Sequence, residues 1–142
     1  MVYLTRLEHF NAAHKLYNPN WSKEKNEEVF GECANENWHG HNFDLYVTIK
    51  GEVNGDTGFL MDVKKLKAII REYVIKKVDH KNLNLDVDFL NGKMCTTENL
   101  AVGIWKALQP QPCSTVRFFV DECFSYGLAA VLPPAKLVRD LL

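Results

Sequence analysis

Residues 30–42 read FGECANENWHGHN, and this stretch decides how the rest of the sequence is interpreted. It places Cys33 a few residues before His39 and His41, which flank Gly40 and run directly into an alternating apolar segment. Side chains two apart on a strand point to the same face, so both imidazoles can reach one metal ion, and Gly40 lets the backbone come close. The pattern predicts a metal-binding pair at the start of a strand.

A third imidazole lies upstream at His14, at the end of an expected strand over residues 2–14. Ala12 and His14 share one parity on that strand, whereas His9 points the other way and is not expected to be a ligand. Three neutral histidines with an open fourth position are typical of a catalytic zinc site, with Cys33 as a nearby thiol rather than a ligand. The alternative is that the histidines are ordinary surface or core residues, because a lone His-X-His pair is a weak signal.

Composition indicates a single domain over residues 1–142. Hydrophobic residues make up 46% of the chain and charged residues 25%, which is ordinary for a globular domain. The formal net charge of −1 argues against a nucleic-acid or anionic-membrane partner. The N-terminal MVYLTRLEHF does not resemble a signal peptide, and no apolar run is long enough to span a bilayer. We therefore expect a cytoplasmic protein.

The four cysteines show no CxxC pairing and no regular spacing, so reduced thiols are expected. Cys95, Cys113 and Cys123 are interpreted as small apolar fillers. Only Cys33 lies beside a histidine cluster that can make a thiol reactive.

The apolar pattern of the remaining chain predicts further strands and two helices. The expected elements are strands over 43–50, 115–122 and 126–132, helices from the N-cap residues Asp62 and Thr96 to about Val78 and Leu108, and a long loop over 15–38 with at most one short helical turn at 23–28. A loop of that length inside a compact domain is usually functional.

Asp79 and His80 follow the first expected helix. A carboxylate beside an imidazole can set its tautomer and suits proton transfer. Neighbours in sequence need not hydrogen-bond each other, however, and the residues alone favour a helix-terminal histidine beside a solvated aspartate.

Four segments resemble the 6-pyruvoyl-tetrahydropterin synthase family in order and spacing. They are FNAAH, FGECANENWHGHN, VDHKNLNLD and CTTENLAVGIW, and together they span about three quarters of the chain. The related 6-carboxytetrahydropterin synthases share the fold and the zinc histidines. In that group the gap between the cysteine and HGH is usually shorter, whereas the five residues between Cys33 and His39 match the pyruvoyl type.

The resemblance implies an α+β tunnelling fold, in which a four-stranded antiparallel sheet carries two helices on one face. Family members close the open sheet edges by forming barrels from three subunits, and two such rings stack into a homohexamer. The resemblance also implies Zn²⁺ as the cofactor, with His14, His39 and His41 as its ligands. Cys33 would be the base, and Asp79 with His80 would relay protons.

The family's last strand normally ends in Glu-Thr, whose carboxylate holds the pterin ring. This chain has VRFFVDEC there, which puts either Val120 or, after a two-residue slide, Glu122 at that position. Glu122 is preferred, since Phe118, Val120 and Glu122 are expected to share one strand face. Thr96, Thr97 and Glu98 would complete the pterin site. The tail PPAKLVRDLL is unlike the usual ending.

By resemblance, the substrate is the small-molecule pterin 7,8-dihydroneopterin triphosphate, which would rearrange to 6-pyruvoyl-tetrahydropterin with loss of triphosphate, as in tetrahydrobiopterin biosynthesis. Two alternatives to this function stay open. The first is a 6-carboxy-5,6,7,8-tetrahydropterin synthase of the queuosine (7-deazapurine) pathway. The second is a protein that binds pterin or zinc without turnover.

Overall fold

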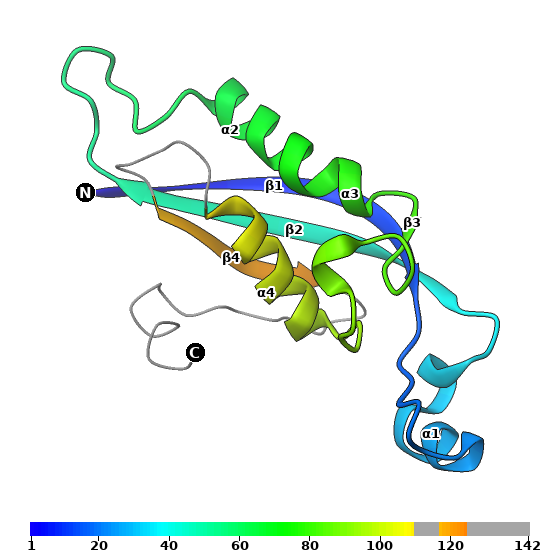
Figure 1. Ribbon diagram of the computed structural model, residues 1–142. Helices are drawn as coiled ribbons and strands as arrows, with labels where there is room; N and C mark the ends of the chain where they lie inside the picture. Colours follow the sequence, from blue (N-terminus) through cyan, green and yellow to red (C-terminus); the bar gives the residue numbers. More distant parts are fainter. Residues whose placement is uncertain (110–116, 125–142) are drawn as a thin grey trace.

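A computed structural model describes residues 1–109 and 117–124, and its centre is a twisted sheet (Figure 1). The strands, in the order β3-β1-β2-β4 across the sheet, are β3 (Lys81–Asn82), β1 (Val2–His14), β2 (His39–Gly51) and β4 (Arg117–Phe124). β1 and β2 pair antiparallel along their whole length, from Val2 opposite Gly51 to His14 opposite His39. β4 is antiparallel to β2, and the short β3 is parallel to β1.

The expected α+β class is confirmed, but the strand count differs from the expectation. The described antiparallel sheet has three long strands, and its fourth member is the two-residue β3, which pairs in parallel. β3 escaped prediction because two residues carry no measurable alternation. The expected strand over 126–132, the tail after it and Cys113 lie outside the described residues.

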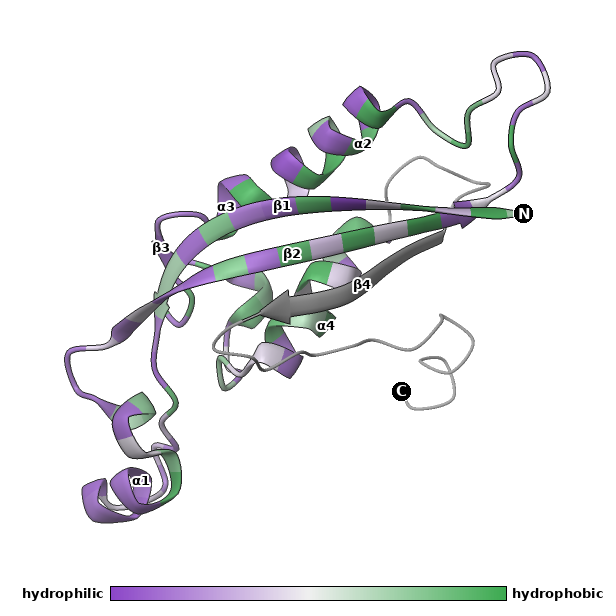
Figure 2. Cartoon of the chain, turned by 180° about the vertical axis from the view of Figure 1, so that it is seen from behind, coloured by the Kyte–Doolittle hydropathy of each residue, from purple (hydrophilic) through white to green (hydrophobic). Residues whose placement is uncertain are grey.

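Two helical segments cover one face of the sheet. The first consists of α2 (Val63–Ile70), a π-helical turn (Arg71–Ile75) and α3 (Lys76–Val78), and the second is α4 (Thr97–Leu108). Asp62 and Thr96 cap these helices through their side chains, as predicted. Figure 2 shows the alternation of hydrophobic and hydrophilic residues along β2, with α4 behind the sheet. A 3₁₀ turn (Asp88–Leu90) precedes α4.

The hydrophobic core lies between the sheet and the helices. It unites alternate residues of β2 with residues at helical spacing on α2, α3 and α4. Its largest fully buried members are Phe10, Phe43, Leu45, Ile49, Leu66, Ile70, Leu83, Leu90, Leu100, Ile104 and Leu108. α4 approaches the preceding 3₁₀ turn closely, since a Cβ on Gly103 would lie 2.9 Å from Cε2 of Phe89 and nearer still to Cδ2. Among the described helices, none has the length and apolarity that crossing a membrane requires.

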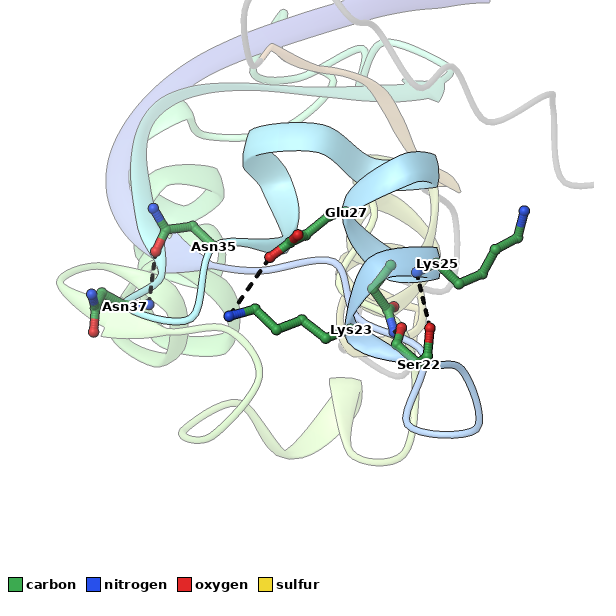
Figure 3. A network of polar contacts seen from close by, with 7 residues as sticks. Ser22, Lys23, Lys25, Glu27, Asn35 and Asn37 are labelled. Carbon is green, nitrogen blue, oxygen red and sulfur yellow. Dashed lines mark hydrogen bonds and ion pairs between the residues drawn. The ribbon is translucent and has the colours of Figure 1, made fainter.

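The segment over 15–38 is more ordered than the sequence pattern predicts. It forms α1 (Lys23–Phe30) and a 3₁₀ turn (Gly31–Ala34), which project away from the other helices in Figure 1. Ser22 caps α1 by accepting from the N–H of Lys25, and Lys23 pairs with Glu27 one turn on (Figure 3). The buried residue of α1 is the polar Asn26, at a position where an apolar residue would be usual.

The amide of Asn26 is saturated by local backbone groups. Its nitrogen donates to the carbonyl oxygens of Asn18 and Ser22, and its oxygen accepts from the N–H of Asn18. Because a polar residue organises this segment, hydrophobic periodicity gave no sign of the helix.

Candidate metal centre

Three histidines converge where β1 ends and β2 begins. His14 and His39 are directly opposite in the strand register, and His41 lies two residues further along the same face of β2. One ligand nitrogen from each ring can be chosen so that all three lie within 4.8 Å of one another. His14 is buried, and the other two are half-buried. Among the described residues this is the one cluster of three or more His, Cys, Asp or Glu side chains with such spacing.

The tautomer of His14 is fixed by a backbone carbonyl. Its Nδ1 lies 2.7 Å from the carbonyl oxygen of Cys95. A carbonyl oxygen can only accept, so Nδ1 carries the proton and Nε2 keeps its lone pair. That Nε2 is buried without a hydrogen-bond partner in the described structure. A metal ligand held by an outer hydrogen bond on its second nitrogen has this arrangement.

The ionisation of the cluster also suits a metal. Burial lowers the pKa of His14 to about 4, although the hydrogen bond to Cys95 opposes that change. Burial likewise lowers the pKa of His39 and of His41, the latter also through its neighbour His39. All three rings are therefore neutral near pH 7, as ligands must be. Both ring nitrogens of His39 are buried without a hydrogen-bond partner among the described residues, which is rare unless an ion accounts for it.

Asp79 and His80 form a hydrogen-bonded pair, whereas the residues alone favoured a helix-terminal histidine beside a solvated aspartate. His80 Nδ1 lies 3.0 Å from Asp79 Oδ1, which also accepts from the N–H of Asn11 at 3.0 Å. The bond from Asn11, followed by that from His80, lowers the pKa of the Asp79 carboxyl. The backbone of His80 is left-handed, with φ of 57°, and its N–H donates to the carbonyl oxygen of Asn11 at 2.6 Å.

A cleft of about 730 Å³ connects the two histidine groups, since both His41 and His80 line it. The side chain of His80 is 78% exposed, so it can exchange protons with solvent. His80, as a candidate proton carrier, and His41 of the histidine cluster therefore line the same cavity.

Cys33 lies in the 3₁₀ turn after α1 and is half-buried. Its carbonyl oxygen accepts from the N–H of Leu16 at 2.8 Å, which ties the turn to the end of β1. Its sulfur does not belong to the cluster of His14, His39 and His41 found among the described residues. The structure thus brings the Cys33 backbone near the end of β1.

The residues expected at the pterin are placed on two elements. Thr96 is the N-cap of α4 and its Oγ1 accepts from the N–H of Asn99, while Thr97 and the exposed Glu98 form the first turn. Glu122 lies opposite Tyr46 in the register of β4.

The expectation that Val120 and Glu122 share a strand face is wrong. A register shift places Val120 opposite Val47 and Glu122 opposite Tyr46, so the residue between them is extra. Val47 and Tyr46 are consecutive and belong to opposite faces of β2. A β-bulge of this kind cannot be read from alternation, which assumes an unbroken period of two.

Two supporting residues escaped the sequence analysis. Cys95 was interpreted as an apolar filler, and burial does raise the pKa of its thiol to about 11, but its carbonyl oxygen orients His14. Asn84 holds the backbone of Lys15 through two hydrogen bonds of 3.1 Å. A backbone carbonyl leaves no trace in sequence, whereas the polar Asn84 between two leucines was a signal that could have been used.

Comparison with known proteins places these features in context. A family model described as 6-pyruvoyl tetrahydropterin synthase matches residues 3–122. The chain is 48% identical over 109 residues to the 6-pyruvoyl tetrahydrobiopterin synthase of Dictyostelium discoideum, covering 77% of this chain and 79% of that protein. It is 44% identical over 100 residues to the Homo sapiens protein of the same name, covering 70% and 69%. The solved structure of Caenorhabditis elegans 6-pyruvoyl tetrahydropterin synthase superposes with a TM-score of 0.72 at 38% identity, covering 77% of each chain.

Proposed function

Because the chain belongs to the 6-pyruvoyl tetrahydropterin synthase family, we propose that it converts 7,8-dihydroneopterin triphosphate into 6-pyruvoyl-tetrahydropterin and releases triphosphate. The reaction is internally balanced, because the side-chain alcohols are oxidised while the ring is reduced. It needs a Lewis acid and groups that move protons. The observation that carries the proposal is the convergence of three neutral histidines beside an Asp-His couple.

We propose His14, His39 and His41 as the ligands of a zinc ion. Their neutral rings, the fixed tautomer of His14 and the unpartnered buried nitrogens of His14 and His39 support this assignment. When bound, zinc supplies Lewis acidity, which makes the hydroxyls of a ligand and the neighbouring C–H protons more acidic.

His80 is proposed to hold or move a proton at Nε2. The Asp79 carboxylate accepts from Nδ1–H, which leaves Nε2 able to exchange a proton with the substrate or with water. The Asn11 N–H keeps the carboxylate in place and ionised, so Asp79 acts through its effect on the imidazole.

Cys33 is proposed as the base that removes a proton from the substrate side chain. Its support is the five-residue spacing to His39 and the contact of its turn with the end of β1. Glu122, with Thr96, Thr97 and Glu98, is proposed to anchor the pterin ring.

The test is incubation of zinc-loaded protein with 7,8-dihydroneopterin triphosphate, followed by mass spectrometry of the pterin. A 6-pyruvoyl product with released triphosphate is the expected result. A 6-carboxy product with acetaldehyde would instead assign the deazapurine-pathway activity. A pterin that binds and returns unchanged would leave a binding protein.

We also propose the homohexamer, a pair of stacked three-subunit barrels. The described sheet is open at β3 and β4, and closure by neighbouring subunits would satisfy such edges. Light scattering should give six times the chain mass of 16.3 kDa. A monomer at micromolar concentration would contradict this.

A further inference from the structure

The half-buried side chain of Lys15 lies against two aromatic rings. Its Nζ is 4.6 Å from the centroid of the Trp38 ring and 5.3 Å from that of the Tyr17 ring. A cation at these distances is attracted by the electrons of a ring face, most strongly by tryptophan. The acidic residues of the hollow that Lys15 lines are Glu27, Glu32 and Glu36. In the described part of the chain no ion pair includes Lys15, so the rings rather than a carboxylate hold its ammonium group.

The contact between Lys15 and Trp38 lies one residue beyond a pair of proposed zinc ligands. His14 and His39 are direct partners in the register of β1 and β2. Lys15 is the residue after His14, and Trp38 is the residue before His39. The contact therefore joins the two chains at the point where residues 15–38 leave the sheet and return to it.

The backbone of Trp38 is in the left-handed region, with φ of 68°. This conformation is a genuine outlier for a bulky residue and costs free energy. The turn that leads to it is closed by the Trp38 N–H, which donates to the carbonyl oxygen of Asn35 at 3.2 Å. The side chain of Asn35 also accepts from the N–H of Asn37 at 2.8 Å (Figure 3). A strained residue persists only where surrounding contacts hold it, and the ammonium group of Lys15 provides such a contact.

The backbone on either side of the Lys15 side chain is itself fixed. Both the N–H and the carbonyl oxygen of Lys15 are hydrogen-bonded to the side chain of Asn84 at 3.1 Å. The next residue, Leu16, donates its N–H to the carbonyl oxygen of Cys33 at 2.8 Å. Since its backbone is tied in this way, Lys15 can determine where Trp38 lies.

We infer that Lys15 is a positioning residue of the proposed zinc site: its ammonium group holds Trp38, and Trp38 keeps His39 opposite His14. The inference rests on the proposed function through its zinc ligands. A protonated lysine has no lone pair, so Lys15 is not itself a ligand. Removing its charge distinguishes positioning from simple electrostatics. A nearby positive charge repels a metal cation, so loss of the charge alone would strengthen zinc binding, whereas loss of a positioning contact weakens it.

The test measures the zinc affinity of variants by competition with a chromophoric chelator. Lys15→Met keeps the length of the side chain without its charge, and it should weaken zinc binding about fivefold, the effect of losing one cation–π contact. Lys15→Arg should restore the affinity, because a guanidinium group also stacks on tryptophan. Adding Lys15→Met to Trp38→Leu should cause no further weakening, since both changes remove the same contact. The visible spectrum of the Co²⁺-loaded protein, which reports coordination geometry, should change in Lys15→Met and return to that of the wild type in Lys15→Arg.

Lys50→Met is the matched control. The Nζ of Lys50 lies 5.0 Å from the centroid of the Tyr3 ring, a contact of the same kind at the opposite end of β2 from His39. Unchanged or stronger zinc binding in Lys15→Met would overturn the inference while leaving the proposed ligands intact, and so would an equal weakening in Lys50→Met. A wild-type protein that binds no zinc would instead overturn the proposed zinc site, and the inference with it. Thermal unfolding of each metal-free variant establishes that the comparison is made on folded protein.

Discussion

The side-chain amide of Asn84 brackets the backbone of Lys15, accepting from its N–H and donating to its carbonyl oxygen, each at 3.1 Å. Asn84 thereby fixes the chain immediately after His14. The next residue back, Leu83, donates its N–H to the carbonyl oxygen of Ala13 at 2.8 Å. The end of β1 that carries the first histidine is thus held from the segment after β3.

Asn84→Ala should weaken zinc binding about tenfold, because supporting contacts of a metal ligand typically have that effect. The affinity is measured by competition with a chromophoric chelator. Asn54→Ala is the control, since the Asn54 side chain also makes two hydrogen bonds to the backbone, accepting from the N–H groups of Asp56 and Thr57, but in the turn after β2. Equal zinc affinity in wild type and Asn84→Ala would refute the positioning role.

Lowered histidine pKa values make the metal-free protein sensitive to mild acid. The ordinary pKa of histidine is 6.5, whereas burial lowers the pKa of His14 to about 4. Between these two pH values His14 binds a proton in the unfolded chain but not in the folded one. The free energy of unfolding should therefore fall as pH drops through this window, by about 3 kcal/mol from His14 alone. Urea unfolding at about pH 7 and about pH 4.5 measures the difference. His14→Phe should show a smaller one, and a wild-type stability equal at both values would contradict the burial argument.

Cys33→Ala should lower turnover by about a hundredfold or more, while zinc content stays at one ion per chain. The thiol is proposed as a base, and it lies outside the described histidine cluster. Metal analysis and product formation are measured on the same sample. Loss of zinc in this variant would show that the sulfur is a ligand, and His39→Ala supplies the comparison in which zinc should be lost.

His80→Gln should lower turnover by about a hundredfold or more with zinc retained, because glutamine cannot carry a proton between two nitrogens. His9→Gln is the matched control. His9 also pairs with an aspartate, at 2.6 Å from Asp44 Oδ1, but it lies outside the cleft that holds His41. Similar activity in both variants would exclude His80 as the proton carrier.

Gly103→Ala should destabilise the protein by about 1 kcal/mol, although alanine favours helices. The added Cβ would collide with the ring of Phe89, and overpacking of about 1–3 kcal/mol exceeds the helical gain of about 1 kcal/mol. Thermal unfolding compares it with Lys106→Ala on the exposed side of α4. A higher melting temperature for Gly103→Ala would mean that Phe89 moves aside freely.

Sequence reasoning succeeded where one periodicity governs the chain. Parity alone put His14, His39 and His41 on one face of two strands, and the structure brings their rings together. Asp62 and Thr96 likewise marked the helix starts, because capping is a local interaction between a side chain and the next turn.

The failures occurred where contacts between distant residues decide the geometry. The carbonyl oxygen of Cys95 reaches His14 across the fold, and the pairing of Asp79 with His80 depends on the left-handed backbone that Asn11 holds. The bulge between Val120 and Glu122 depends on how β4 meets β2. None of these is encoded in a repeating pattern, so each required the three-dimensional structure.

Residues 15–38 leave the sheet after His14 and return at His39, its direct partner in the register. An ion bound to both rings would join the two ends of this segment, as a covalent cross-link closes a loop. Such closure removes conformational entropy from the unfolded chain and limits how far the ends of the segment can separate. The proposed zinc ion would then act as a cross-link as well as a Lewis acid, and it would restrict the conformational freedom of the segment that carries Cys33.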